Sequence, residues 1–374
     1  MSLPRRKKIL VYGAGAIGRG YLPWVFSPDE FEYYYVERND GLREMLKSAR
    51  QFTTWKTVKK NSENLYETLV VPITQCFAPG EEKNIIKDID VVVVAVGPRN
   101  VLSLTSSLKG TTMPIVCCEN DSSIPVLLSS VVDNPNIVFA VPDVITSNTA
   151  SEDIKKSDPL SIITEDGVCY IDDRVSRIGG NAMYISKEEL DKQWMAKLYL
   201  HNTPHCIAAY LGSLLGVQYV HEAMEAPQAR KIVSGAMCEM QEVLLKKFKI
   251  DERFIDWYAD KELERFSNRL LFDPVSRVAR EPFRKLAPSE RLLGAAQLCL
   301  STGVHPQSIM LGIMAAFFYS NQHDPDLNIQ YLVRSLEATD FLRIVMQLPP
   351  DQALHQLLLE QWESNKMVLK AIYE

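Results

Sequence analysis

A lysine, an asparagine and a histidine lie close together in the second half of the chain, at a spacing that could support proton transfer. They are Lys197, Asn202 and His205. In a continuous α-helix, Asn202 would lie about 140° and His205 about 80° around the axis from Lys197, so all three could face one cleft. A lysine among apolar residues has its pKa lowered by desolvation, so its amine can exchange protons near neutral pH. An asparagine amide can stabilise a developing alkoxide, so this pattern predicts acid–base chemistry on an alcohol or a carbonyl group.

The same spacing has a purely structural interpretation. A surface lysine, a capping asparagine and a core histidine are all common features of an amphipathic helix. The segment also contains Pro204, which removes a backbone donor and predicts a kink in the helix.

A glycine-rich segment follows the first apolar run of the chain, Lys8–Tyr12. Its GxGxxG pattern stands between a predicted strand and a segment that can be helical. The first glycine permits a tight turn, the second lets the backbone approach a pyrophosphate, and the third lets the helix pack against the strand. The N-terminal N–H groups of a helix then bind the phosphates. We therefore predict a dinucleotide-binding loop formed by Gly13, Ala14, Gly15, Ala16, Ile17 and Gly18.

An acidic residue follows the second predicted strand, Tyr33–Val36. It is Glu37, about 20 residues after Gly18, as in dinucleotide-binding units. A carboxylate there can accept both ribose hydroxyls and would repel a 2′-phosphate, so the sequence favours NAD over NADP. Because the basic residue Arg38 is adjacent, NADP stays an alternative cofactor. The structural alternative is a tight turn beside a surface glutamate, without a cofactor.

A later strand ends in Ala95-Val96-Gly97-Pro98. The ribose and nicotinamide of a dinucleotide would pass the sheet at such a strand end, so Val96 and Gly97 are predicted cofactor residues. An ordinary strand-ending turn is the alternative.

The first half of the chain alternates short apolar runs with turn-rich or helix-forming segments. The valine block Val91–Val94 is apolar on both faces, as expected of a central parallel strand that is covered by helices on both sides. This pattern predicts a doubly wound, Rossmann-like α/β unit with a parallel sheet. The predicted strands are Lys8–Tyr12, Tyr33–Val36, Leu69–Ile73, Ile89–Val96, Pro114–Cys118 and Ile137–Val141.

The pattern changes near residue 186. Ser186-Lys-Glu-Glu189 forms a capping box, and the sequence from there on has helical periodicity. We predict an NAD-binding Rossmann domain over residues 1–185 and a mostly α-helical substrate and catalytic domain over residues 186–374. A cleft between two such domains is the expected location of a ligand.

Composition excludes several classes of protein. The 374 residues are 46% apolar and 24% charged, with 41 basic and 47 acidic side chains and a net charge of −6, which is not typical of a nucleic-acid-binding protein. The seven cysteines form no CxxC pair and the six histidines no HExxH motif, so we predict no metal site and cysteines that are small buried hydrophobes. No apolar run approaches the ~20 residues of a membrane span.

Two further features of the sequence bear on the cellular location and the oligomeric state. Basic residues before Ile9–Tyr12 could suggest a signal peptide, but the glycines interrupt the apolar run at once. We expect a cytoplasmic protein without membrane or nucleic-acid partners. The chain has no heptad pattern, which favours a monomer.

Several collinear motifs together resemble the polyol-specific long-chain dehydrogenases/reductases. The resemblance spans nearly the whole chain, and the chain length suits the short hexitol-phosphate branch better than the longer uronate reductases. The matching blocks are Gly13–Gly20, Ala95–Pro98, Cys118–Asn120, Lys197–Gly212, Arg265-Phe266 and Arg277–Leu286.

The resemblance implies a role for each matching position. Lys197 would be the general acid/base, the amides of Asn120 and Asn202 would polarise the reacting oxygen, and His205 would orient the substrate. The implied activity is the NAD-dependent interconversion of a hexitol phosphate and a ketose phosphate at a secondary alcohol, without a metal. The implied substrate-binding residues are Asp143, Arg277, Arg280 and Lys285.

Three departures from the family pattern keep alternatives open. Asp143-Val-Ile lacks an arginine that the family has there, Asp121 and its neighbours replace an Arg-Gly-Thr type segment, and Pro204 replaces a glycine. The missing arginine motivates a second interpretation, a dehydrogenase or reductase of an unphosphorylated polyol or a uronate. A third, from another class, is a nicotinamide-binding sensor that has lost turnover, which the intact Lys197, Asn202 and His205 argue against.

Overall fold

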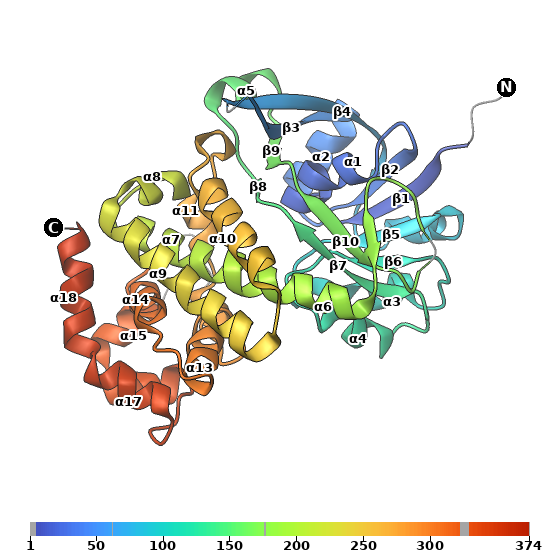
Figure 1. The fold of residues 1–374 in the computed structure, drawn as a ribbon. Helices are drawn as coiled ribbons and strands as arrows, with labels where there is room; N and C mark the ends of the chain where they lie inside the picture. Colours follow the sequence, from blue (N-terminus) through green and yellow to red (C-terminus); the bar gives the residue numbers. More distant parts are fainter. Residues whose placement is uncertain (1–4, 62, 176, 322–328, 374) are drawn as a thin grey trace. The chain divides into compact units, whose positions relative to one another are not determined.

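The computed structural model describes residues 5–61, 63–175, 177–321 and 329–373 (Figure 1). The chain forms two compact units, Met1–Trp194 and Met195–Glu374. These units reflect packing alone, so the division into a cofactor domain and a substrate domain after residue 185 stays a prediction.

The first unit is built on one sheet. Within the described residues it has eleven strands, in the order β11-β10-β7-β6-β5-β1-β2-β4-β3-β9-β8. The strands are β1 Lys7–Tyr12, β2 Phe31–Val36, β3 Gln51–Lys60, β4 Glu63–Phe77, β5 Val91–Val94, β6 Ile115–Cys117, β7 Ile137–Asp143, β8 Thr146–Ser147, β9 Ile162–Glu165, β10 Val168–Asp172 and β11 Met183–Ile185.

The centre of the sheet confirms the predicted doubly wound fold. β1 pairs in parallel with β2 on one side and β5 on the other, and β5, β6 and β7 continue the parallel arrangement. The valines of β5 are fully buried, as their apolar character on both faces predicts. Because parallel strands end at the same edge, the residues after β1, β5 and β6 lie along one side of the sheet, where ligands bind in such folds.

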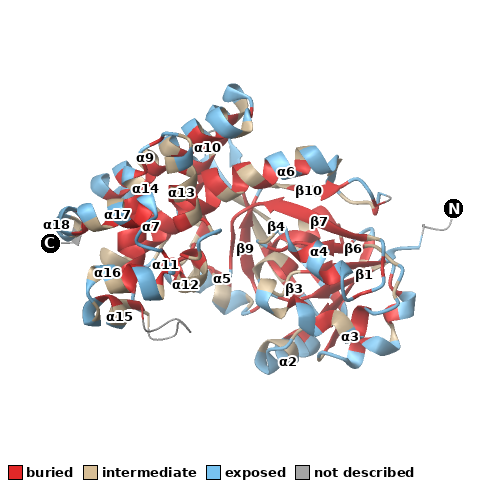
Figure 2. Cartoon of the chain, turned by 90° about the horizontal axis from the view of Figure 1, so that it is seen from below, coloured by how far each residue is buried: buried red, intermediate tan, exposed pale blue. Residues whose placement is uncertain are grey.

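Helices cover both faces of this sheet. Alternate residues of β1 belong to different core clusters, Ile9 and Val11 to one, and Leu10 and Tyr12 to the other. The first cluster includes residues of α1 and α2 and the second residues of α3 and α4, and Figure 2 shows the strands as mostly buried. The helices that begin in this unit are α1 Leu22–Val25, α2 Asp40–Ala49, α3 Thr105–Leu108, α4 Ile124–Ser129, α5 Glu152–Ser157 and α6 Lys187–Ala196, whose last two residues belong to the second unit.

The outer strands differ from the sequence-based prediction. Leu69–Ile73 is only part of the 15-residue strand β4, which pairs antiparallel with β3, and β10 pairs antiparallel with β7. The predicted strands did not include β3. In the structure Phe52, Thr54 and Thr57 of β3 are buried, while most of its other side chains are partly or fully exposed.

The second unit is helical, as predicted. α7 is buried along most of its length and packs against α8, α9, α11 and α14. No helix of the described residues is both long enough and apolar enough to span a bilayer. The helices are α7 Thr203–Leu214, α8 Val220–Glu225, α9 Pro227–Val243, α10 Glu252–Phe266, α11 Val275–Ala279, α12 Pro282–Lys285, α13 Leu293–Ser301, α14 Gln307–Phe317, α15 Ile329–Ser335, α16 Ala338–Asp340, α17 Ala353–Glu360 and α18 Trp362–Tyr373.

Candidate active site

The glycine loop after β1 has the geometry that its motif predicts. Gly13 has φ +93°, and a Cβ there would lie 2.3 Å from the Ala95 carbonyl oxygen. A Cβ at Gly18 would lie 2.0 Å from the Gly13 carbonyl oxygen, so close backbone packing requires both glycines. No heavy atom lies within 4 Å of a Cβ built on Gly15, which leaves open space where a pyrophosphate would approach the backbone.

The segment after the loop is a π turn, Ala16–Tyr21, that leads into the short helix α1. Within it, Arg19 is buried and its Nε donates a hydrogen bond to the Ala14 carbonyl oxygen at 2.6 Å. Its guanidinium also donates to the carbonyl oxygen of Leu160, and burial lowers the pKa of Arg19. Arg19 therefore connects the backbone of the loop at Ala14 to Leu160, a role that the motif alone did not predict.

Glu37 follows β2 and reaches the glycine loop. Its Oε2 accepts a hydrogen bond from the Ala14 N–H at 2.9 Å, and its Oε1 accepts one from the Asn39 N–H at 2.7 Å. A carboxylate has about four acceptor positions, so Glu37 can still bind ribose hydroxyls. Arg38 instead donates to Asn100 Oδ1 at 3.2 Å. The loop and Glu37 thus fit the adenosine and pyrophosphate groups of NAD.

The ends of β5 and β6 are joined by a residue that we did not predict. Glu119 is buried, and its Oε1 accepts hydrogen bonds from the N–H groups of Val96 at 2.7 Å and Gly97 at 3.0 Å. Burial raises the pKa of Glu119 to about 7, although the two N–H donors oppose that shift in part. Its neighbour Asn120 is exposed, and Asp143 is buried at the end of β7.

The segment that carries Lys197 is not a continuous α-helix, so the angles predicted from the α-helical period are wrong. Residues Lys197–Asn202 form a π turn, and the Thr203 N–H bonds to the Leu198 carbonyl oxygen, five residues back. In a π turn, residues five apart are one turn apart, which brings Lys197 and Asn202 to the same side. Pro204 lies in the first turn of α7, where a missing N–H is tolerated, so the irregularity precedes the proline.

Lys197 and Asn202 are both buried. The Asn202 Nδ2 amide has no hydrogen-bond partner among the described residues. A buried amide donor without a partner is unfavourable, so a substrate oxygen that accepts its hydrogen bond would stabilise the site. Lys197 and Asn202 belong to the second unit and Asn120 to the first, so their meeting at one oxygen stays a prediction.

His205 is held by an ion-paired carboxylate. Its Nε2 lies 2.8 Å from Asp273 Oδ2, and its ring stacks on Phe266 with centroids 4.9 Å apart and an interplanar angle of 1°. Asp273 Oδ1 accepts from Arg277 Nε at 2.9 Å. Burial opposes the ionisation of Asp273, but Arg277 and His205 together outweigh it and lower the pKa of Asp273. His205 can thus donate from Nε2 to a carboxylate and present Nδ1 to a substrate hydroxyl.

A second histidine, which we did not single out, has a similar arrangement. His201 Nδ1 lies 2.5 Å from Glu262 Oε2, and Glu262 also accepts from Arg265. The rings of His201 and His205 have centroids 5.0 Å apart, so the two histidines form one buried aromatic group with Phe266. The only sequence signal was the Arg265-Phe266 pair, which does not by itself point to His201.

The predicted basic cluster is largely neutralised within the second unit. Arg277 pairs with Asp273, and Arg284 Nε donates to Glu281 at 3.1 Å. Lys285 is buried and donates to the carbonyl oxygens of Val278 and Arg280, and burial lowers its pKa well below the usual range. The Arg280 side chain is exposed and makes no ion pair within the part of the chain that the structure describes. A phosphate contact of Arg280 stays a prediction.

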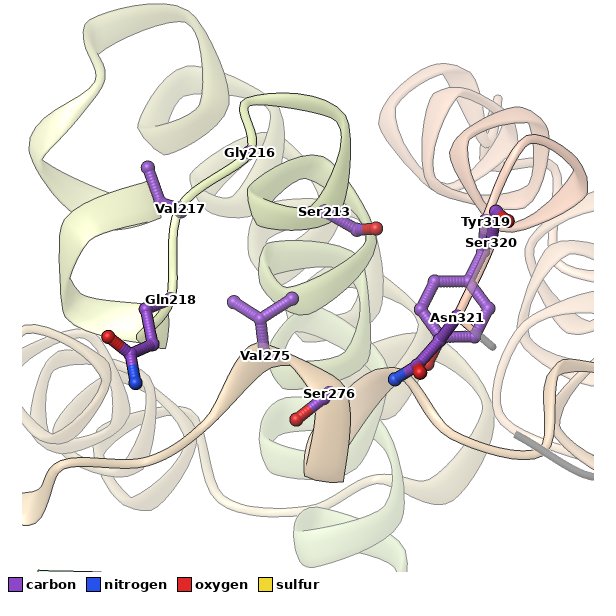
Figure 3. Close-up of a pocket in the computed structure, with 9 residues that line it drawn as sticks. All are labelled: Ser213, Gly216, Val217, Gln218, Val275, Ser276, Tyr319, Ser320 and Asn321. Atoms are coloured by element: carbon purple, nitrogen blue, oxygen red, sulfur yellow. The ribbon is translucent and has the colours of Figure 1, made fainter. Parts of the chain in front are cut away.

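A cavity of about 260 Å³ in the second unit contains none of the predicted site residues. It lies beside α11 and is lined mainly by uncharged polar side chains (Figure 3). The lining residues are Ser213, Gly216, Val217, Gln218, Val275, Ser276, Tyr319, Ser320 and Asn321. Nothing in its chemistry connects it with proton transfer or with a dinucleotide.

The fold and the glycine loop define the first unit as a Rossmann-type dinucleotide-binding unit, joined to a helical unit with a buried lysine, asparagine and histidine. Residues 189–341 match the family model for the mannitol dehydrogenase C-terminal domain. A mannitol-1-phosphate 5-dehydrogenase of Thermoanaerobacter pseudethanolicus is 30% identical over 342 residues, which cover 85% of this chain and 87% of that protein. The chain belongs to the mannitol dehydrogenase family, which confirms the resemblance.

A further relative and two solved structures are also similar to this chain. A mannitol-1-phosphate 5-dehydrogenase of Clostridium acetobutylicum is 27% identical over 96% of this chain and 99% of its own length. The fold resembles that of mannitol 2-dehydrogenase of Pseudomonas fluorescens in its ternary complex with NAD and D-mannitol, with a TM-score of 0.75, 15% identity and coverage of 98% of this chain and 94% of the other. A D-sorbitol dehydrogenase has a TM-score of 0.64 at 14% identity, with 98% and 95% of the two chains covered.

Proposed function

We propose that the chain is an NAD-dependent dehydrogenase that interconverts a hexitol phosphate and a ketose phosphate, of the mannitol 1-phosphate and fructose 6-phosphate type. Family membership makes it a polyol dehydrogenase by class. The observation that carries the proposal is the buried Asn202 amide without a partner, which lies on the same π turn as Lys197. The names of relatives that match nearly the whole chain support the phosphorylated substrate.

The first unit has the residues that would hold the cofactor. Gly13 and Gly18 shape the loop, Gly15 leaves room for the pyrophosphate, and Glu37 accepts the adenosine ribose hydroxyls. When bound there, NAD would supply the acceptor for the hydride of the alcohol carbon. No Zn²⁺ or other Lewis acid enters the proposal, because the Asn120 and Asn202 amides can polarise the oxygen.

The second unit has the residues that would move the proton. In the oxidation, neutral Lys197 takes the hydroxyl proton, and the Asn202 Nδ2 amide donates a hydrogen bond to the oxygen as negative charge develops on it. Asn120 donates to the same oxygen. His205 accepts a neighbouring hydroxyl at Nδ1, because Asp273 holds Nε2. Asp143 and Lys285 remain proposed substrate contacts, and we propose a monomer that acts in the cytoplasm.

The preference for NAD over NADP tests the proposed role of Glu37 in cofactor binding. Wild type should use NAD with a higher kcat/KM than NADP, because the Glu37 carboxylate repels a 2′-phosphate. Glu37→Ala should narrow that ratio by about tenfold, the order expected for one nearby charge. Steady-state kinetics with both cofactors measures the ratio. A wild type that prefers NADP would make Arg38 the dominant contact and the assignment of Glu37 wrong, and Arg38→Ala would test that directly.

The preference for a phosphorylated over an unphosphorylated substrate tests the proposed role of Arg280 in phosphate binding. Arg280→Ala should raise KM for the phosphorylated substrate by about 10- to 100-fold, since charge-assisted bonds to phosphate are each worth about 1.5–3 kcal/mol. KM for the unphosphorylated analogue should change little. Arg334 on α15 is an exposed arginine outside the cluster, so Arg334→Ala is the matched control. Equal effects of Arg280→Ala on both substrates would remove the phosphate role.

One assay separates the candidate functions. The oxidation of NADH is followed by absorbance with fructose 6-phosphate and then with a panel of unphosphorylated ketoses and uronates. Turnover with fructose 6-phosphate alone supports the proposal. Turnover only with unphosphorylated substrates supports the second function, which the missing arginine after Asp143 favours, and NADH binding without turnover supports the sensor.

A further inference from the structure

Glu119 has a contact pattern that its place in the sequence does not explain. It is 4% exposed and lies two residues after the end of β6. A single carboxylate oxygen, Oε1, accepts the N–H groups of Val96 and Gly97, which follow β5. Gly97 has φ +87°, a conformation that favours glycine, so the carboxylate holds a turn of unusual geometry at the end of a central strand.

The negative charge of Glu119 is not needed for these two bonds. The amide oxygen of a glutamine could accept both N–H groups without the desolvation that a buried carboxylate suffers. Burial and the nearby Asp121 both oppose ionisation, and the pKa of Glu119 rises to about 7. A buried carboxyl group with a pKa near neutrality at a ligand-binding edge indicates a functional role.

The sheet order shows which part of a dinucleotide would approach this turn. β1 lies between β2, which leads to Glu37, and β5 and β6, which lead to Gly97 and Glu119. A dinucleotide crosses the carboxyl ends of the strands at the point where the strand order reverses. With the adenosine at Glu37, the nicotinamide half would lie at the ends of β5 and β6. The nicotinamide ring is cationic in NAD⁺ and neutral in NADH, so a carboxylate there would distinguish the two forms.

We propose that Glu119 is a positioning residue for the nicotinamide half of the cofactor, which holds the turn at Val96 and Gly97 and, when ionised, favours NAD⁺ over NADH. This inference rests on the proposed NAD-dependent function. Glu119 acts through the turn and through its charge.

The proposal predicts a pH dependence whose sign follows from the chemistry. Below pH 7, Glu119 is mostly protonated and neutral, so its attraction for the cationic ring is lost, and above pH 7 the attraction is fully present. The charged groups near the turn are Asp121 and Arg38, the second through Asn100, whose Nδ2 donates to the Val96 carbonyl oxygen. The exposed Arg99 follows the turn. Burial raises the pKa of Cys117, two residues before Glu119, to about 12, so that thiol stays neutral.

Equilibrium binding of NAD⁺ and NADH to the protein without substrate is the test. NADH fluorescence gives one Kd, and displacement of NADH by NAD⁺ gives the other, between about pH 5.5 and 8.5. In wild type, NAD⁺ binding should tighten by about tenfold as the pH rises through 7, the order expected for one charge in a partly polar environment. NADH binding should change by less than about twofold.

Glu119→Gln keeps both acceptor bonds and removes the charge. Its NAD⁺ binding should be weaker than that of wild type by about tenfold at high pH and should lose its dependence on pH. Asp121→Asn should move the midpoint of the wild-type profile to lower pH, because the like charge that opposes ionisation is gone. Glu119→Asp should bind both nucleotides less tightly but keep the preference for NAD⁺ at high pH.

Glu239 offers a matched control. It is a partly buried glutamate in the second unit that accepts the N–H groups of Ser308 at 2.6 Å and Ile309 at 3.0 Å, and burial raises its pKa as well. Glu239→Gln should therefore show wild-type nucleotide profiles.

The outcomes separate the two proposals. If Glu119→Gln binds NAD⁺ with the wild-type pH dependence, or if Glu239→Gln loses it equally, the role of Glu119 is overturned and the NAD-dependent function stands. If wild type binds neither nucleotide at any pH, the proposed function itself is overturned. If Glu119→Gln does not fold, a pH-independent preference in Glu119→Asp overturns the inference.

Discussion

Replacement of Lys197 by alanine should lower the rate of polyol oxidation by roughly 10²–10⁴, the usual contribution of a positioned proton-transfer group. Lys197 is buried on a π turn with Asn202, and in the proposed mechanism no other group accepts the hydroxyl proton. The Kd for NAD should stay nearly unchanged, because the residues proposed to hold the cofactor belong to the first unit. Stopped-flow measurement of NADH formation, with the Kd from fluorescence, gives both quantities.

Three further experiments test the role of Lys197 as the proton acceptor. At saturating NAD, oxidation by wild type should become faster as the pH rises, since only the neutral amine can take a proton, and Lys197→Ala should lose that dependence. Small primary amines added to Lys197→Ala should restore part of the rate. Lys192 on α6 is exposed and pairs with Glu188, so Lys192→Ala is the control and should keep wild-type kinetics. Near-normal turnover of Lys197→Ala would refute the assignment, and His205 would become the next candidate.

Replacement of Asn202 by alanine should lower kcat by about 10²–10³, as found when one donor to a developing oxyanion is removed. The reason is the buried Nδ2 amide, which has no hydrogen-bond partner within the described part of the chain. The KM for the polyol should change much less than kcat, because the amide bond strengthens as charge develops on the oxygen in the transition state. Steady-state kinetics separates the two parameters.

The conservative variant identifies the chemical role of this side chain. Asn202→Asp has nearly the same shape but offers only acceptor oxygens at neutral pH, so its kcat should fall at least as far as that of the alanine variant. If Asn202→Asp keeps most of its activity, the oxyanion role is wrong.

Local sequence rules predicted the backbone geometry of the glycine loop. Gly13, Gly15 and Gly18 follow a strand, and their positions depend on steric requirements of the backbone that a motif records directly. The same rules did not predict a role for Glu119, although Glu119 is the neighbour of Asn120. Its partners, Val96 and Gly97, are more than 20 residues away along the chain, and only the pairing of β5 with β6 brings them together.

The catalytic candidates show a different limit of prediction from the sequence. The spacing of Lys197, Asn202 and His205 predicted a shared face but gave wrong angles, because a helical period assumes i to i+4 hydrogen bonds. A π turn depends on how α7 and its neighbours pack, and packing cannot be read from one segment. The basic cluster was overestimated for a related reason, since Asp273 and Glu281 pair with Arg277 and Arg284 only in the folded chain.

The sequence by itself determined the doubly wound centre of the sheet, the glycine loop, the helical second half and the family. Each depends on local periodicity, on glycine sterics or on motifs that span a few residues. Only the tertiary structure decided the antiparallel outer strands, the π turn at Lys197, the pairing of His205 with Asp273 and the burial of Glu119. These features arise from contacts between residues far apart in the chain, whose energies depend on desolvation and on partners that the local sequence does not specify.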